Sequence, residues 1–304
     1  MQARTKAVKV SAAELALRQR FTALARGLAG ARAGDVNGIH QARVATRRLR
    51  EALPLVTAGA AGRKLERTIR RLTRALGPVR ELDVALQTLD ELQRGEQVPR
   101  AAVVCLRQLM TAERQTLHAE AVKAIDRADL DKARQKAMAH VGSDTDTPAA
   151  HVARAQRRAA RRAERLRAAI DNAAGIYLPD RLHDIRIATK KLRYAIEMVR
   201  PGAATTRSGR PASKSLRSTT GQLAVLKRAQ DLLGRMHDLE MLITRTRAVQ
   251  GTSQAPDLRL SGDLDHLVRT LEMECRLLHG HYMAARPQLL DVCERVERHA
   301  SRAA

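Results

Sequence analysis

Two segments of the sequence repeat one arrangement of histidine and basic residues. Residues 39–56 read IHQARVATRRLREALPLV, and residues 182–199 read LHDIRIATKKLRYAIEMV. At about 100° per residue, a helix would gather their histidines and cations into one stripe opposite an apolar face. The stripe comprises His40, Arg43, Arg47 and Arg50 in the first segment and His183, Arg186, Lys190 and Arg193 in the second. Arg48 and Lys191 flank the two stripes.

Both stripes lack the acidic residues that usually accompany cations on a solvated helix face. Such a face mixes Lys with Glu four residues apart, because these pairs stabilise the helix. Like charges on successive turns repel one another, and a bound anion would offset that repulsion. Guanidinium groups bind phosphate oxygens two at a time. The repeated stripe therefore predicts a surface that binds a phosphate-rich polyanion.

Two more segments carry basic stripes of the same kind. One stripe lies near the start of the expected third helix, and the other follows most of the expected fifth helix. Their residues are Arg63, Arg67, Arg70 and Arg74 in the first, and Arg154, Arg158, Arg161 and Arg165 in the second. We expect these stripes to line a shared groove or pore together with the repeated stripes.

A second repeated pair follows each basic stripe and adds acidic residues to the pattern. Residues 69–84 read IRRLTRALGPVRELDV, and residues 226–241 read LKRAQDLLGRMHDLEM. The first segment contains RELD at residues 80–83, and the second contains HDLE at residues 237–240. We expect their acidic residues to pair with cations of a neighbouring helix. Gly77 and Gly234 are expected to allow a close helix approach or a kink.

The composition restricts both the fold and the partner. The 304 residues contain 56 Lys and Arg against 32 Asp and Glu, a formal net charge of +24, and most of the cations are Arg. There is no Trp, and Tyr and Phe are rare, whereas Ala, Leu and Arg favour helices. We therefore exclude all-β and α/β folds. The charge points to nucleic acid, an anionic membrane or polyphosphate.

Helical periodicity predicts long helices joined by short breaks. The expected ranges are 11–31, 38–58, 61–93, 98–127, 148–173, 180–200, 215–249, 260–285 and 287–301. Polar stretches at 142–147, 201–214 and 250–257 are expected to be loops.

The two motif pairs occur in the same order, which indicates a tandem duplication. The first pair is offset by 143 residues and the second by 157, and the loop at 201–214 accounts for the difference. The expected halves are residues 11–141 and 148–301 within a single domain of residues 1–304.

Three scattered cysteines, Cys105, Cys275 and Cys293, do not suggest a disulfide framework or a zinc ribbon. The segment Met1–Val10 lacks the apolar core of a secretory signal, and no apolar stretch is long enough to span a bilayer. We expect a soluble cytoplasmic protein with no membrane insertion.

The motifs H-x-x-R-x-x-x-R-R-L-R at 40–50 and H-x-x-R-x-x-x-K-K-L-R at 183–193 resemble those of the CHAD domain, the conserved histidine α-helical domain. Each is followed by an L-G-x-x-[RH]-[ED]-L-[DE] segment, so the resemblance covers roughly residues 11–300. It implies an all-α fold: a tandem pair of four-helix bundles with pseudo-two-fold symmetry around a basic central cavity.

The resemblance also implies that the cavity binds inorganic polyphosphate and that the protein associates with polyphosphate granules. Asp231 stands where Arg74 does, and His237 where Arg80 does, so the halves need not contribute equally. The ExExK signature of the CYTH domain that many relatives carry is not seen. The binding residues it implies are His40, Arg43, Arg47, Arg48, Arg50, Arg70, Arg71, Arg74 and Arg80, then His183, Arg186, Lys190, Lys191, Arg193, Lys227, Arg228 and His237.

Three functions fit these observations, and the first is a binding protein for polyphosphate that is not an enzyme. The second is a nucleic-acid binder that contacts the phosphate backbone, although few aromatics are present for base stacking. The third is an enzyme that processes polyphosphate, with a histidine as general acid or nucleophile. We favour the first, expect no cofactor and no metal, and expect protonation of His40 and His183 to strengthen binding on mild acidification.

Overall fold

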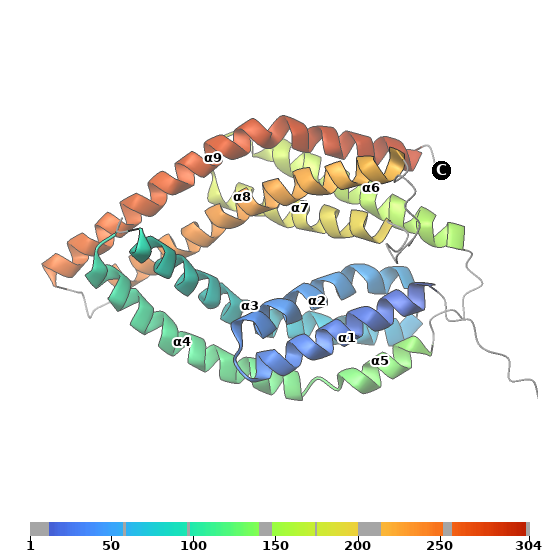
Figure 1. Ribbon diagram of the computed structural model, residues 1–304, viewed down its shortest axis with the longest axis horizontal. Coiled ribbons are helices and arrows are strands. Elements are labelled where there is room, and N and C mark those ends of the chain that lie inside the picture. The colour runs from blue at the N-terminus through green and yellow to red at the C-terminus, as the bar shows by residue number, and fades with distance from the viewer. Residues whose placement is uncertain are drawn as a thin grey trace, which may run out of the picture.

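A computed structural model of the chain (Figure 1) contains only helices and connecting turns among the residues it describes. The described residues are 12–56, 59–95, 98–139, 148–173, 175–199, 214–251 and 257–301. Residues 1–11, the expected loop at 142–147 and all but the last residue of the expected loop at 201–214 lie outside them. The prediction of an all-α fold is confirmed.

The helices follow the predicted ranges closely, with two differences described below. Their bounds are α1 Ala12–Arg32, α2 Val36–Val56, α3 Gly59–Arg94, α4 Arg100–Asp126, α5 Leu130–Met138, α6 Pro148–Asn172, α7 Pro179–Val199, α8 Lys214–Gln250 and α9 Leu258–Ser301.

The predicted break at residue 286 is wrong, because α9 continues through Pro287 to Ser301. A proline inside a helix removes one backbone hydrogen bond and costs about 3 kcal/mol. Packing of α9 against α8, α6 and α4 outweighs this cost. In agreement with the expected range 61–93, α3 continues through Gly77 and Pro78.

The short helix α5 was not predicted. The carboxylate of Asp129 caps it by accepting a hydrogen bond from the backbone N–H of Lys132 at 3.2 Å. Its apolar residues Leu130, Ala133 and Met138 pack against the core of the first half. The first half therefore contains five helices among the described residues rather than four.

Three apolar cores hold the helices together. One is built from α1, α2, α3 and α4, and a second from α6, α7, α8 and α9. The third is shared, because α3 and α4 contribute Leu89 and Leu106 to it while α8 and α9 contribute Leu242 and Leu267. Figure 1 shows these four helices meeting at one end of the molecule, with α1–α2 and α6–α7 on either side of the other end.

The helices α1 and α2 approach one another backbone to backbone. A Cβ atom on Gly38 would lie 2.5 Å from the carbonyl carbon of Gly30, and one on Gly27 would lie 2.5 Å from the backbone nitrogen of Ala42. Real Cβ atoms do not approach other atoms so closely, so only glycine fits at these positions. This contact fixes how α2 sits on α1 and which way its remaining face turns.

We predict that Gly38→Ala destabilises the fold by about 1 to 3 kcal/mol, because the added methyl group would force two backbones apart. Chemical denaturation of the variant and the wild type would measure the loss. Gly262→Ala in α9 is the matched control, since a Cβ there meets nothing within 4 Å. An equal effect of the two substitutions would contradict the close contact.

Candidate functional site

The basic stripes of α2 and α7 face each other across the two halves. The charge of Arg186 on α7 lowers the pKa of Arg43 on α2, and the charges of Arg43 and Arg47 lower the pKa of Lys190 on α7. Such effects require these groups to lie close together. We call the gathered side chains the central cluster: His40, Arg43, Arg47, Arg80, His183, Arg186, Lys190 and His237.

The apolar faces of α2 and α7 turn the stripes toward one another. On each helix the face opposite the stripe is buried in the core of its own half. Those buried residues are Ile39, Ala42, Ala45, Leu49 and Leu53 on α2, and Leu182, Ile185, Leu192, Ala195 and Ile196 on α7. Because α2 also packs against α7, the two stripes stay near one another as long as both apolar faces remain buried.

Lys190 has a strongly lowered pKa in the central cluster. Burial lowers its pKa to about 6, and the charges of Arg186, Arg47 and Arg43 act in the same direction. The carboxylate of Asp238 opposes them. At neutral pH the ammonium group is therefore largely deprotonated, and an anion placed beside it would favour proton uptake.

Arg43 and Arg186 are partly buried, and neither forms a tight ion pair among the described residues. Burial, followed by the charge of Arg47, lowers the pKa of Arg43 to about 10, and its Nη1 donates to the carbonyl of Thr73 at 3.3 Å. In Arg186, the Nε atom is buried and has no hydrogen-bond partner among the described residues, and Asp238 lies 3.8 Å from its Nη2. Buried charges normally have tight partners, so this arrangement fits a site that receives an external anion.

The glycine at the start of each L-G-x-x segment has a different role in each half. A Cβ on Gly77 would lie 2.9 Å from Nη1 of Arg43, so this glycine leaves room for the guanidinium group. A Cβ on Gly234 would meet nothing within 4 Å. Gly77 is therefore close to a side chain rather than to a helix backbone, and no close approach occurs at Gly234. The alternative expectation, a kink, stays a prediction at both positions.

The histidines do not behave as the sequence suggested. Nδ1 of His183 lies 3.2 Å from Nδ1 of His237, so one ring must donate and the other accept. Burial, with the charge of Arg186 and others nearby, lowers the pKa of His237 to about 3 and also lowers that of His183. Burial, with Arg80, lowers the pKa of His40. Mild acidification would therefore protonate Lys190 rather than the histidines.

Two acids of the second motif, Asp83 and Asp238, pair with cations of neighbouring helices, as expected. Asp83 is buried and pairs with Arg114 of α4 at 2.6 Å. Asp238 faces Arg186 of α7. The carboxylate of Glu240 accepts a hydrogen bond from the hydroxyl of Tyr177. The Asp83 contact joins α3 to α4, and the Asp238 contact joins α8 to α7.

Part of the stripe on α6 has a structural role that the sequence did not predict. Arg158 pairs with the buried carboxylate of Glu51 on α2 at 2.8 Å, and Arg162 lies 3.4 Å from the same carboxylate. Glu51 thereby joins the two halves. Arg48 on α2 makes a looser bridge to Glu197 on α7, at 3.8 Å.

The remaining predicted residues lie around the central cluster rather than in it. Arg70 pairs with Glu66 on its own helix at 2.8 Å, and Arg193 donates to Gln230 at 2.9 Å and to Glu197 at 3.2 Å. Exposed cations of the set are Arg63, Arg67, Arg71, Arg74, Arg161, Lys227 and Arg228. Arg154 is partly buried, Arg50 lies near Arg47 and Arg70, and Arg165 lies near Lys191.

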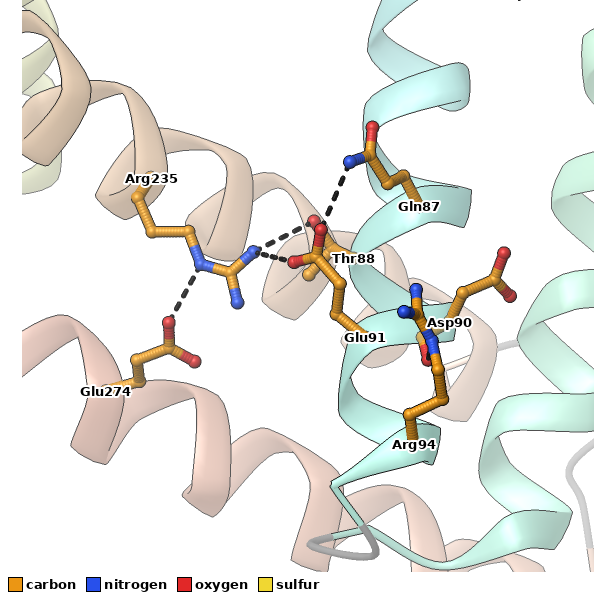
Figure 2. A network of polar contacts seen from close by, with 7 residues as sticks. All are labelled: Gln87, Thr88, Asp90, Glu91, Arg94, Arg235 and Glu274. Carbon is orange, nitrogen blue, oxygen red and sulfur yellow. Dashed lines mark hydrogen bonds and ion pairs between the residues drawn. The ribbon is translucent and has the colours of Figure 1, made fainter.

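Lys227 and Arg228 line a shallow hollow of about 480 Å³ on α8, beside Leu278 of α9. Arg235 lines the same hollow and was not predicted as a functional residue. It donates to Glu274 of α9 at 2.8 Å and to Glu91 of α3 at 2.9 Å, as Figure 2 shows. Arg235 therefore joins α8 and α9 to the first half, near the shared core.

These features define an all-helical protein whose two sets of helices bring basic side chains together. The CHAD domain family matches residues 15–247, and the chain belongs to this family. No curated protein matches the sequence.

Two solved structures share the fold. A crystal structure of the CHAD domain from the plant Ricinus communis is 21% identical with a TM-score of 0.58, covering 98% of this chain and 96% of that one. PptA from Streptomyces chartreusis is 18% identical with a TM-score of 0.66, covering 91% and 98% of the respective chains. Among the helices described for the present protein, none is long and apolar enough to cross a membrane.

We predict that Lys190→Met raises the thermal unfolding midpoint, by roughly 2 to 4 °C for each kcal/mol of burial and charge penalty removed. The folded pKa of about 6 lies below the unfolded value of 10.5, so the lysine penalises folding fully below pH 6. The penalty fades as the pH rises toward 10.5. The gain from Lys190→Met should therefore shrink over that range. Lys64→Met, at an exposed site, is the control, and equal shifts would contradict this penalty.

Proposed function

We propose that this protein binds inorganic polyphosphate at the central cluster and catalyses no reaction on it. In this proposal it is a cytoplasmic protein associated with polyphosphate granules. The observation that carries the proposal is the convergence of Arg43 and Arg47 with Arg186 and Lys190 from the other half. The family supports it, since the sequence motifs are those through which CHAD domains are expected to bind this polymer.

A linear phosphate polymer suits the arrangement of these cations. Each internal phosphate carries about one negative charge, and the cations follow successive turns of α2 and α7. An anion lying between the helices would relieve their repulsion and supply the missing hydrogen-bond partner of Arg186 Nε. It would also raise the pKa of Lys190, so that binding takes up a proton near neutral pH.

A nucleic acid is the alternative partner, and the aromatic residues argue against a single strand. Base stacking needs exposed rings. Phe21, Tyr194 and Tyr282 are buried, and Tyr177 donates its hydroxyl hydrogen to Glu240. Binding of a duplex through its phosphates is the form of this alternative that remains open.

Two features support binding without catalysis. His183 and His237 contact each other and have lowered pKa values, so both are poor general acids at neutral pH. The neighbouring acids Asp83 and Asp238 face cations of adjacent helices. Phosphate release from polyphosphate by the purified protein, lost in His40→Ala, would contradict this part of the proposal.

We predict that the double substitution Arg43→Ala and Arg186→Ala weakens binding of long-chain polyphosphate at least about 100-fold. The reason is that each lost charged hydrogen bond contributes about 1.5 to 3 kcal/mol. Fluorescence anisotropy at several salt concentrations would measure affinity, and the wild type should lose affinity steeply with salt. Circular dichroism would verify that both proteins stay helical.

The matched control for this experiment replaces Arg259 and Arg269 by Ala, which removes the same charge from exposed sites on α9. Equal weakening in both double variants would show that net charge alone drives binding. A competition with duplex DNA at equal phosphate concentration tests the alternative partner. Displacement of polyphosphate by DNA in that assay would favour the nucleic-acid function.

We predict that Gly77→Ala weakens polyphosphate binding about tenfold, because the new methyl group would displace the guanidinium of Arg43. The side chain is flexible at its end, so the fold should survive. Gly234→Ala, at the equivalent place in α8, should leave affinity unchanged. The same assay measures both variants, and identical affinities would exclude a fixed position of Arg43 as part of the site.

A further inference from the structure

Residues of α6 and α7 line a hollow of about 300 Å³. Its cations come from both helices: Arg162, Arg165, Arg181 and Lys191. Asp184 and Asn172 add a carboxylate and an amide, and Ala168, Ala169, Ile187 and Ala188 form its apolar part. We call this the α6–α7 hollow.

We call the line of contact between α6 and α7 a seam. The equivalent seam in the first half, between α1 and α2, is closed. The buried residues of α1 (Leu17, Phe21, Leu24, Leu28 and Ala31) have the same spacing as those of α6 (Ala159, Ala163, Leu166, Ile170 and Ala173). In this alignment Gly27 is equivalent to Ala169, and Gly30 is equivalent to Asn172. In the histidine motif Gly38 is equivalent to Arg181, since each precedes its histidine by two residues.

The glycines explain why one seam is closed and the other is open. Gly27, Gly30 and Gly38 let the backbones of α1 and α2 touch, with no room for a Cβ. Ala169, Asn172 and Arg181 have side chains at these positions, so α6 and α7 cannot approach in the same way. The second half therefore has a cavity where the first half has a backbone contact, and its lining includes a cation in place of a glycine.

The charge of the α6–α7 hollow is strongly positive. Among its lining residues Asp184 is the acid, against four cations. Glu51 of α2 lies beside the hollow, where it binds Arg158 and Arg162. Burial, followed by the charge of Arg162, lowers the pKa of Lys191, and Arg165 and Arg50 add to this despite the opposing effect of Glu51. The cations repel one another more than Glu51 compensates.

The hollow is separate from the central cluster, although α7 contributes to both. Lys190 responds to the charges of Arg43, Arg47 and Arg186, whereas Lys191 responds to Arg162 and Arg165 on α6. None of the central cluster residues lines the hollow. A ligand in the hollow would therefore not share these contacts with a chain bound at the central cluster.

We propose that the α6–α7 hollow is a second anion site, which binds a compact triphosphate group, free or esterified. This inference goes beyond the proposed polymer binding. The volume corresponds to that of about ten water molecules, which suits a short ligand rather than a long chain. Several cations around so small a volume favour a ligand with several negative charges. The amide of Asn172 offers a further donor.

The test is isothermal titration calorimetry with inorganic tripolyphosphate. Substituting Arg165 and Arg181 by Ala should abolish tripolyphosphate binding at one class of site, or weaken the affinity of that class at least about tenfold. Arg43→Ala with Arg186→Ala should retain that class, which separates this proposal from the proposed polymer site. The Arg259→Ala with Arg269→Ala variant controls for net charge.

A second variant tests the hollow without removing charge. Ala168→Phe should fill the space, because Ala168 lines it and is exposed enough for the fold to tolerate the ring. It should weaken the same class of tripolyphosphate binding. A parallel titration with adenosine triphosphate distinguishes an esterified from a free triphosphate. Binding of either ligand at the class of site that these substitutions affect supports the proposal. Titrations of the Arg165/Arg181 and Ala168→Phe variants that match the wild type would overturn the proposal.

Discussion

The desolvation of basic groups that lie beside one another is the constraint on which the rest of this structure depends. Arg43, Arg186 and Lys190 lose hydration and face one another, and each effect lowers a pKa. The apolar faces of α2 and α7 hold them there, because turning the cations outward would expose the core residues on the opposite side. The free energy of core burial thus keeps the central cluster in place.

Much of the fold could be predicted from the sequence, because long amphipathic helices repeat their apolar residues regularly. The failures occurred where tertiary contacts outweigh a local signal. Pro287 indicated a helix end, yet packing along α9 keeps the helix continuous. The helix α5 is short and its polar sequence hides its few core residues, although Asp129 followed by Leu130 and Ala133 was a usable capping signal. The sequence could not show the shared core, since its members come from four distant segments.

The sequence could predict which basic residues share a helix face, but not their contacts with other helices or their pKa values. Spacing placed Arg43, Arg47, Arg186 and Lys190 on their helices, and the structure brings them together. Spacing could not show that Glu51 binds Arg158, or that His183 and His237 touch, because these pairs join different helices. The lowered histidine pKa values depend on burial, which a helical projection does not report.

The shared core has a consequence for either half taken alone. The first half by itself would leave the ends of α3 and α4 uncovered, since Leu89 and Leu106 pack with Leu242 and Leu267 of the second half. Such a half would need a second copy, or another apolar partner, to cover that surface.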